Sequence, residues 1–232
     1  MIKPKFPICF VLSLISLVPS AYPQATQMPV EVLKKMDGVG KGFRNFTAQF
    51  SQRTYTAVLK EFDETETGEL TYAIAAGGSA LMRVEYKKPG VRILTIKGGV
   101  ATLFQPSVNQ AQIYKLGKNK NKAEYLVLGI GQSPARLQEA YDIQYQGTEN
   151  VNGAPCWTLL LKPKNSGVSA LFSAITLWVK KSTGVPIQDK WQAPNGDYTL
   201  ITFSNEQLNV KSIPPSKFEQ KLPPGVEKQV IQ

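Results

Sequence analysis

Residues 81–116, LMRVEYKKPGVRILTIKGGVATLFQPSVNQAQIYKL, carry the clearest structural signal in the chain. Apolar and polar residues alternate there at the two-residue period of a β-strand, in four runs at 81–86, 91–97, 100–104 and 110–116. Turn-forming pairs separate the runs: Pro89-Gly90, Gly98-Gly99 and Pro106-Ser107. Connections this short leave no room for a helical crossover, so the stretch predicts an antiparallel β-meander.

Similar strand patterns extend from this stretch toward both ends of the chain. Before it, Phe46, Ala48 and Phe50 alternate with polar residues, and after it Asn195-Gly196 marks a hairpin turn. The predicted strands number about eleven and lie at residues 46–51, 68–74, 81–86, 91–97, 100–104, 110–116, 141–147, 156–162, 174–181, 185–192 and 198–206. A last extended segment is expected around residues 226–231.

Few helices are predicted. Val32 and Met36 recur at helical spacing near the start of the domain, and Gly38 and Gly40 are expected to end that helix. Two short helices are expected at residues 123–131 and 133–140, the second capped by Ser133. The sequence therefore predicts a mainly β (α+β) fold.

The first 25 residues, MIKPKFPICFVLSLISLVPSAYPQA, have the features of a secretory signal peptide. A basic start precedes an apolar run over residues 8–18, and small or helix-breaking residues follow it. The apolar run is shorter than the roughly 20 residues of a transmembrane helix. Cys9 lies inside the run, so lipid attachment there is not expected. We expect residues 1–25 to be cleaved, residues 26–232 to form one domain without a linker, and the protein to be periplasmic.

Composition narrows the classes of function. The 232 residues carry a formal net charge of +10 and contain no histidine, which excludes Ser-His-Asp and Cys-His catalysis and histidine-ligated metal sites. Cys9 and Cys156 are the only cysteines, so CxxC redox chemistry is excluded, and Cys156 is expected to pack as a small apolar residue. Four carboxylates gather in a polar turn where solvation is expected: Asp63, Glu64, Glu66 and Glu69. We therefore predict that the protein is not an enzyme and has no catalytic residues, no cofactor and no metal.

Several predicted strands are apolar on both faces. In residues 198–203, Tyr198 and Leu200 share one face while Ile201 and Phe203 share the other. A sheet with one face in water alternates more cleanly. Either both faces of some strands are covered, or the sheet curls around an apolar interior that helices close. Periodicity alone leaves open whether that interior is a filled core or a ligand cavity.

The meander at residues 81–116 resembles the core of the LolA-like family of periplasmic outer-membrane lipoprotein carriers. Further matches occur in the same order along the chain. FTAQFSQ at residues 46–52 resembles the family's first strand, and Gly68-Glu-Leu70 follows it. Phe218 and LPPGV at residues 222–226 resemble the family's C-terminal end. The resemblance covers residues 28–232 and rests on the ordered set of matches, since no single motif is diagnostic.

This resemblance implies one incompletely closed antiparallel β-barrel of about eleven strands, with helices as a lid over an apolar cavity. It also implies a carrier that shields the acyl chains of lipoproteins. The implied partners are acylated lipoproteins, an inner-membrane ATP-driven lipoprotein release transporter and an outer-membrane lipoprotein receptor. Triacylated cargo needs such shielding because exposing apolar surface to water costs roughly 25 cal/mol per Å². A carrier of this kind is expected to be a monomer.

Nine residues are candidates for acyl-chain binding, although the pattern does not reveal which strand face is inside. They are Phe50, Leu70, Tyr72, Met82, Val84, Tyr86, Leu94, Ile96 and Phe104. The sequence also departs from the family pattern, because an Arg-Pro pair whose arginine holds the lid closed is replaced by residues 75–80, AAGGSA. The latch is then absent, or it is supplied by Arg83, Arg53 or another residue.

Two alternatives stay open at this stage. A periplasmic module that senses lipids or lipoproteins has the same fold and differs from a carrier in its partners. The basic loop at residues 117–122, GKNKNK, is either a solvated loop or a docking site for an acidic transporter domain or anionic headgroups. Nucleic acid is not expected as a partner, because the loop lacks interleaved aromatic residues.

Overall fold

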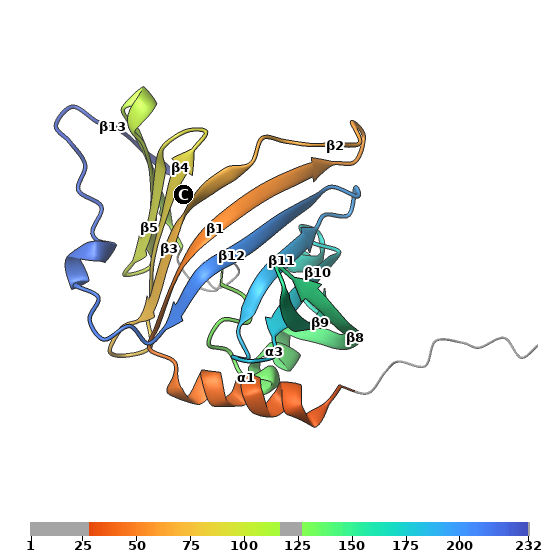
Figure 1. Cartoon of the computed structure of the whole chain (residues 1–232). Coiled ribbons are helices and arrows are strands. Elements are labelled where there is room, and N and C mark those ends of the chain that lie inside the picture. Colours follow the sequence, from red (N-terminus) through yellow and green to blue (C-terminus); the bar gives the residue numbers. More distant parts are fainter. Residues whose placement is uncertain (1–27, 117–126, 232) are drawn as a thin grey trace, which may run out of the picture.

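The computed structural model describes residues 28–116 and 127–231, which form one large, strongly curved β-sheet with few helices (Figure 1). In these residues the sheet has thirteen strands, in the order β13-β7-β6-β5-β4-β3-β1-β12-β11-β10-β9-β8, with β2 paired to β1 alone. All pairs are antiparallel except the parallel pair of β13 and β7. The prediction of a mainly β fold is confirmed. The predicted signal peptide and basic loop lie outside the described residues.

The eleven predicted strands all occur. They are β1 (Asn45–Thr56), β3 (Glu66–Ile74), β4 (Ala80–Lys88), β5 (Arg92–Lys97), β6 (Val100–Gln105), β7 (Gln110–Lys115), β8 (Tyr141–Val151), β9 (Ala154–Pro163), β10 (Ala174–Lys180), β11 (Pro186–Gln192) and β12 (Tyr198–Leu208). Six are one to four residues longer than predicted, β1 is six residues longer, and β5, β7, β10 and β11 are each one residue shorter. Two strands are additional: β2 (Glu61–Phe62) and β13 (Glu227–Ile231), the latter formed by the expected extended segment. Between β6 and β7 lies the short 3₁₀ helix η1 (Pro106–Val108).

The sheet is open. Among the described strands, β8 and β13 each have a neighbour on one side only, and no pairing joins them. Residues 28–116 and 127–231 therefore form a curved sheet that does not close into a barrel.

The helices differ from prediction in two places. Helix α1 (Val30–Gly42) continues through Gly38 and Gly40, so the predicted end was wrong. Packing outweighs the poor helix propensity of glycine here, because a Cβ at Gly40 would lie 3.1 Å from the backbone nitrogen of Ser133 and prevent the close approach. The described part of the predicted helix at 123–131, residues 127–131, is a turn.

The other predicted helix is confirmed as α3 (Pro134–Ala140), where the Ser133 hydroxyl accepts a hydrogen bond from the backbone N–H of Arg136 at 3.3 Å. Two further short helices were not predicted, α4 (Ser166–Ser169) and the 3₁₀ helix η2 (Pro215–Phe218). None of the helices in the described part of the chain is long and apolar enough to cross a membrane.

Two groups of buried apolar residues fill the inside of the curve. Cluster A belongs mainly to β1, β3–β6 and β12 and comprises Phe46, Ala48, Phe50, Leu70, Tyr72, Met82, Val84, Ile96, Ala101, Val127, Ile130, Val185 and Phe203. Cluster B belongs mainly to β8–β11, α1 and α3 and comprises Val32, Met36, Leu128, Leu137, Tyr141, Trp157, Leu159, Leu161, Ile175, Leu177, Val179 and Trp191. Ile201 packs against both clusters and links them.

The opposite face of β4 and β5 is also covered. Residues 209–226, here called the C-terminal tail, run along the outside of the sheet before β13 begins (Figure 1). Its helix η2 lies on β4 and β5, and Phe218 there is only 3% exposed. The two-faced strands of the sequence thus have two causes, an apolar interior and a packed outer cover.

Candidate functional site

The candidate site is the part of the inner face formed by β1 and β3–β5. Strand register places Tyr72, Met82 and Ile96 side by side in one row across three strands. Leu70, Val84 and Leu94 form the next row. Paired residues point to the same face of a sheet, so these six predicted residues share the inner face. All six are in cluster A or pack against it.

Phe50 and Tyr86 extend the same surface toward the β1–β2 hairpin. Their rings meet edge to face with centroids 5.2 Å apart. Gly68 lies between them in the register, and a Cβ there would come within 2.7 Å of the Phe50 ring. A glycine at this point of β3 is therefore what lets the aromatic ring lie across the strand. Burial raises the pKa of Tyr86 above its usual range.

Phe104 is the exception among the nine predicted residues. It pairs with Ile93 on β5, and Ile93 pairs with Glu85 on β4. Glu85 alternates with the inward residues Val84 and Tyr86, so Phe104 lies on the outer face. Phe104 is buried, but outside cluster A, and its inclusion among the interior residues is corrected. The sequence misleads here because burial is present on both faces of β6.

A polar group ends the apolar surface beyond Tyr86. Glu66 accepts hydrogen bonds from Arg92 and, at 3.0 Å, from the amide of Gln52. The Arg92 guanidinium lies 4.3 Å from the centroid of the Tyr86 ring. The interior is thus apolar toward α1 and polar toward the β1–β2 hairpin.

Helix α1 covers the apolar end of the interior, below the sheet in Figure 1. Its first half places Val32 and Met36 in cluster B, and its second half packs Val39 against cluster A, as does Phe43 directly after the helix. One helix therefore covers both clusters. The helix follows from the sequence pattern, whereas Val39 and Phe43 were not predicted as interior residues.

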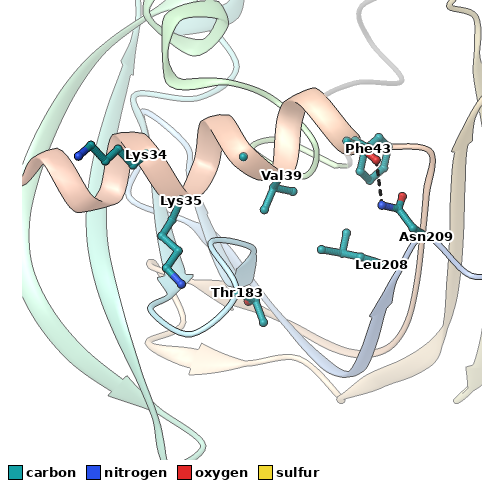
Figure 2. A pocket seen from close by; sticks show the side chains of 9 residues that line it. Lys34, Lys35, Val39, Phe43, Thr183, Leu208 and Asn209 are labelled. Carbon is teal, nitrogen blue, oxygen red and sulfur yellow. Dashed lines mark hydrogen bonds between the residues drawn. The ribbon is translucent and has the colours of Figure 1, made fainter.

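An open pocket of about 370 Å³ lies where α1 meets the end of β12 (Figure 2). Val39 and Leu208 point into it from the helix and the strand, and both also pack against cluster A. Gly38 faces the pocket from α1, and a Cβ there would have no neighbour within 4 Å. Lys34 and Lys35 lie at its edge. The pocket therefore borders the apolar interior at the edge of its helical cover.

The polar contacts that hold α1 involve few residues. The side chain of Asn209 donates to the carbonyl of Gly42 at 2.8 Å, shown as a dashed line in Figure 2, and accepts from the backbone N–H of Arg44 at 2.8 Å. Lys35 donates to the carbonyl of Ser182 at 3.2 Å. The first contact fixes the C-terminal end of the helix, and the second ties its middle to the β10–β11 turn.

The described residues contain no group of three or more His, Cys, Asp or Glu side chains that could hold a metal ion. Cys156 is fully buried beside Val151 and Ile187, as predicted, and burial raises the pKa of its thiol.

A family model described as "Outer membrane lipoprotein carrier protein LolA" matches residues 41–221, which is most of the chain. The protein belongs to this family. The family's description is that of a carrier, which agrees with the resemblance inferred from the meander. A search of curated proteins finds no match.

The fold recurs in solved proteins of low sequence identity. An uncharacterized conserved protein from Thermus thermophilus is 13% identical, with a TM-score of 0.54 over 87% of this chain and 98% of its own. MucB is 14% identical, with a TM-score of 0.50; the match covers 83% of this chain and 62% of MucB. The LolA superfamily protein NE2245 from Nitrosomonas europaea is 16% identical, with a TM-score of 0.40 over 82% of this chain and 97% of its own. The first two likenesses show the fold alone.

The resemblance named Arg83 and Arg53 as possible substitutes for the family's latch arginine. Among the described residues, no hydrogen bond, ion pair or ring contact joins either arginine to α1. Arg83 is on the outer face, where its Nε donates to Glu85 at 2.6 Å. The Arg53 guanidinium lies 4.1 Å from the centroid of the Phe62 ring on β2. In this LolA-family chain the described side-chain hydrogen bonds of α1 are instead those from Asn209 to Gly42 and from Lys35 to Ser182.

Proposed function

We propose that this LolA-family protein is a periplasmic carrier that holds the acyl chains of lipoproteins inside its curved sheet and carries them from the inner to the outer membrane. It would take cargo from an inner-membrane ATP-driven transporter and deliver it to an outer-membrane receptor. The cargo is bound by burial of apolar surface and released without a covalent step.

One observation carries this proposal: helix α1 packs on both clusters of a continuous apolar inner face, and an open pocket lies at its edge. Eight of the nine predicted interior residues belong to cluster A or pack against it. Acyl chains could replace the contacts that Val39 and Phe43 make with this cluster. The gain is roughly 25 cal/mol for each Å² of apolar surface removed from water.

The composition of α1 supports its role as a movable cover. Residues 38–42 are GVGKG, and glycine inside a helix costs roughly 0.5–1 kcal/mol relative to alanine. Gly38 and Gly42 have open space at the Cβ position, so no steric contact requires glycine at either place. A helix that is weak in this segment separates from the sheet at low cost.

Binding is tested with the mature protein and a triacylated lipopeptide, by native mass spectrometry and titration. We expect one lipopeptide to bind the wild type and Gly38→Leu to weaken binding, because the new side chain fills the pocket beside α1. Gly90→Leu is the matched control, since Gly90 also has no neighbour within 4 Å but lies in the β4–β5 turn. Failure of the wild type to bind any lipopeptide would refute the proposed function.

Transfer is tested separately, because a lipid-sensing module of this fold would bind acyl chains without delivering them. Inner-membrane vesicles loaded with a labelled lipoprotein are mixed with the protein and then with outer-membrane vesicles. A carrier moves the label into the soluble fraction and onward to the second membrane. Binding without movement of the label would identify a sensing module instead.

A further inference from the structure

A buried carboxyl group with an unpartnered oxygen lies on the inner face, among the residues that the structure describes. Asp189 on β11 is 1% exposed, and within the described part of the chain its Oδ1 has no hydrogen-bond partner. Burial raises the pKa of Asp189 well above its usual range, which favours the neutral carboxylic acid over the carboxylate. Unpartnered groups of this kind are rare in folded proteins and call for an explanation.

Strand register fixes where this carboxyl group points. Asp189 pairs with Leu177 of β10 on one side and with Ile201 of β12 on the other. Leu177 belongs to cluster B, and Ile201 packs against both clusters. Asp189 therefore faces the interior at the place where clusters A and B meet.

The same row of paired residues continues into the polar end of the interior. Ile201 pairs with Gln52 of β1, and Gln52 pairs with Glu66 of β3. Two strand spacings separate Gln52 from Asp189, which is about 10 Å. Asp189 thus lies level with the boundary between the apolar part of the interior and its polar end.

A purely structural role does not explain this residue. On the opposite face of the sheet, Thr158 of β9 is 2% exposed and donates a hydrogen bond to Glu149 at 3.0 Å, so a comparably buried polar group is satisfied. An unsatisfied buried donor or acceptor costs about 1–3 kcal/mol, and an apolar residue of similar size would avoid that cost. The presence of Asp189 despite this cost points to a hydrogen-bond partner that is supplied by a bound ligand.

We propose that Asp189 is the polar anchor for the head of a bound acyl ligand, donating a hydrogen bond from its carboxylic acid to the carbonyl of an ester-linked acyl chain. The acyl chains then lie along clusters A and B on the α1 side, and the head of the ligand lies level with Gln52 and Glu66. An ester or amide carbonyl oxygen accepts hydrogen bonds and donates none, and a protonated carboxyl group supplies the donor. The inference rests on the proposed function and adds the group that selects acylated ligands over plain hydrocarbon.

The experiment compares two probes that differ only in their carbonyl groups. One is a diacylated lipopeptide with two ester-linked palmitoyl chains, and the other is its analogue with two ether-linked hexadecyl chains. For each protein we divide the dissociation constant of the ether probe by that of the ester probe. This ratio is then divided by the same ratio for Asp189→Leu, and the result is the quotient compared below. Differences in how the probes partition from water cancel in this quotient.

For the wild type we expect a quotient of about three- to tenfold in favour of the ester, the range of one net hydrogen bond. Asp189→Asn keeps a donor and should retain most of this preference. Gln188→Leu is the matched control on the same strand, because Gln188 alternates with Asp189 and lies on the other face, and it should keep the full preference. Asp189→Leu should remain folded and gain stability, which a urea titration checks.

The outcomes separate the two proposals. If the wild type binds both probes and its quotient is near one, Asp189 is not the anchor while the binding function stands. If the wild type binds neither probe, the proposed function fails and the anchor fails with it. A lower quotient in Gln188→Leu than in Asp189→Asn would also overturn the assignment to Asp189.

Discussion

The two faces of β4 and β5 are both covered, and their covers are held in different ways. On the outer face Lys217 of the C-terminal tail donates to Glu85 at 2.7 Å, and Lys97 donates to Glu219 at 3.1 Å. Burial alone would raise the pKa of Glu85, but the hydrogen bonds from Lys217 and Arg83 outweigh it and lower the pKa. Farther along the tail, the Asn109 side chain donates to the Gly225 carbonyl at 2.9 Å. Polar contacts are therefore spread along the outer cover.

The inner cover, α1, has fewer polar contacts and three glycines in its second half. Apolar burial is similar on both faces, since Phe218 outside is 3% exposed and Met82 inside is fully buried. The two covers differ in the polar contacts that hold them and not in how deeply the apolar residues beneath them are buried. A face that binds a ligand needs a cover that can move away from the sheet. A face that only stabilises the fold needs no movable cover.

The largest expected effect is on the outer face. Phe218→Ala should lower the free energy of unfolding by about 3–5 kcal/mol, because it removes a buried ring and leaves a cavity under the tail. Urea denaturation measures the loss. Added lipopeptide should stabilise this variant and the wild type by the same amount, since the cavity lies on the face that the ligand does not reach.

On the inner face, Met82→Ala should cost about 2–5 kcal/mol in the absence of ligand. Here saturating lipopeptide should recover part of the loss, because acyl chains can fill the space left by the thioether side chain. Equal recovery in the Met82 and Phe218 variants would remove the functional distinction between the two faces.

A smaller effect follows from the buried Asp189. The unfolded chain releases this proton near pH 4, whereas the raised pKa keeps it bound in the folded state. The contribution of Asp189 to the free energy of unfolding is therefore fully present below about pH 4. It falls as the pH rises toward the folded pKa, by up to about 1.4 kcal/mol per pH unit. Urea titrations between pH 4 and 7 should show Asp189→Asn gaining on the wild type as the pH rises. A constant difference between the two would contradict a protonated Asp189.

The smallest effect concerns α1 itself. Gly38→Ala should stabilise the protein by about 0.5–1 kcal/mol and slow lipopeptide exchange, because it strengthens the helix without meeting a neighbour. Gly40→Ala is the matched control, since its Cβ would lie 3.1 Å from the Ser133 nitrogen and cancel the gain. Stopped-flow displacement of a fluorescent lipopeptide measures the exchange rate. Unchanged exchange in a stabilised Gly38→Ala protein would show that α1 does not open.

The strands were predictable because alternation and turn residues are local signals, and the meander from Ala80 to Lys115 follows them closely. The choice of inner face was not, because both faces of the meander hold buried side chains: Phe104 on the outer face is as buried as Val84 on the inner face. Asp189 did leave a signal in the sequence. It shares its parity with Trp191 in a strand that is otherwise apolar on that side, and a single acid in such a position marks a buried titratable group.

The parallel pairing of β13 with β7 has a consequence for how the protein behaves at high concentration. An exposed edge strand offers free N–H and C=O groups to other chains and is a common start of aggregation. Residues 227–231 occupy the edge of β7, and their own outer edge spans only five residues. At the other end of the sheet, β8 is interrupted by the irregularity between Tyr145 and Gly147, which breaks the run available to a second chain. Removing residues 227–231 should therefore turn a monodisperse protein into one that self-associates through β7, visible by light scattering before any loss of lipopeptide binding.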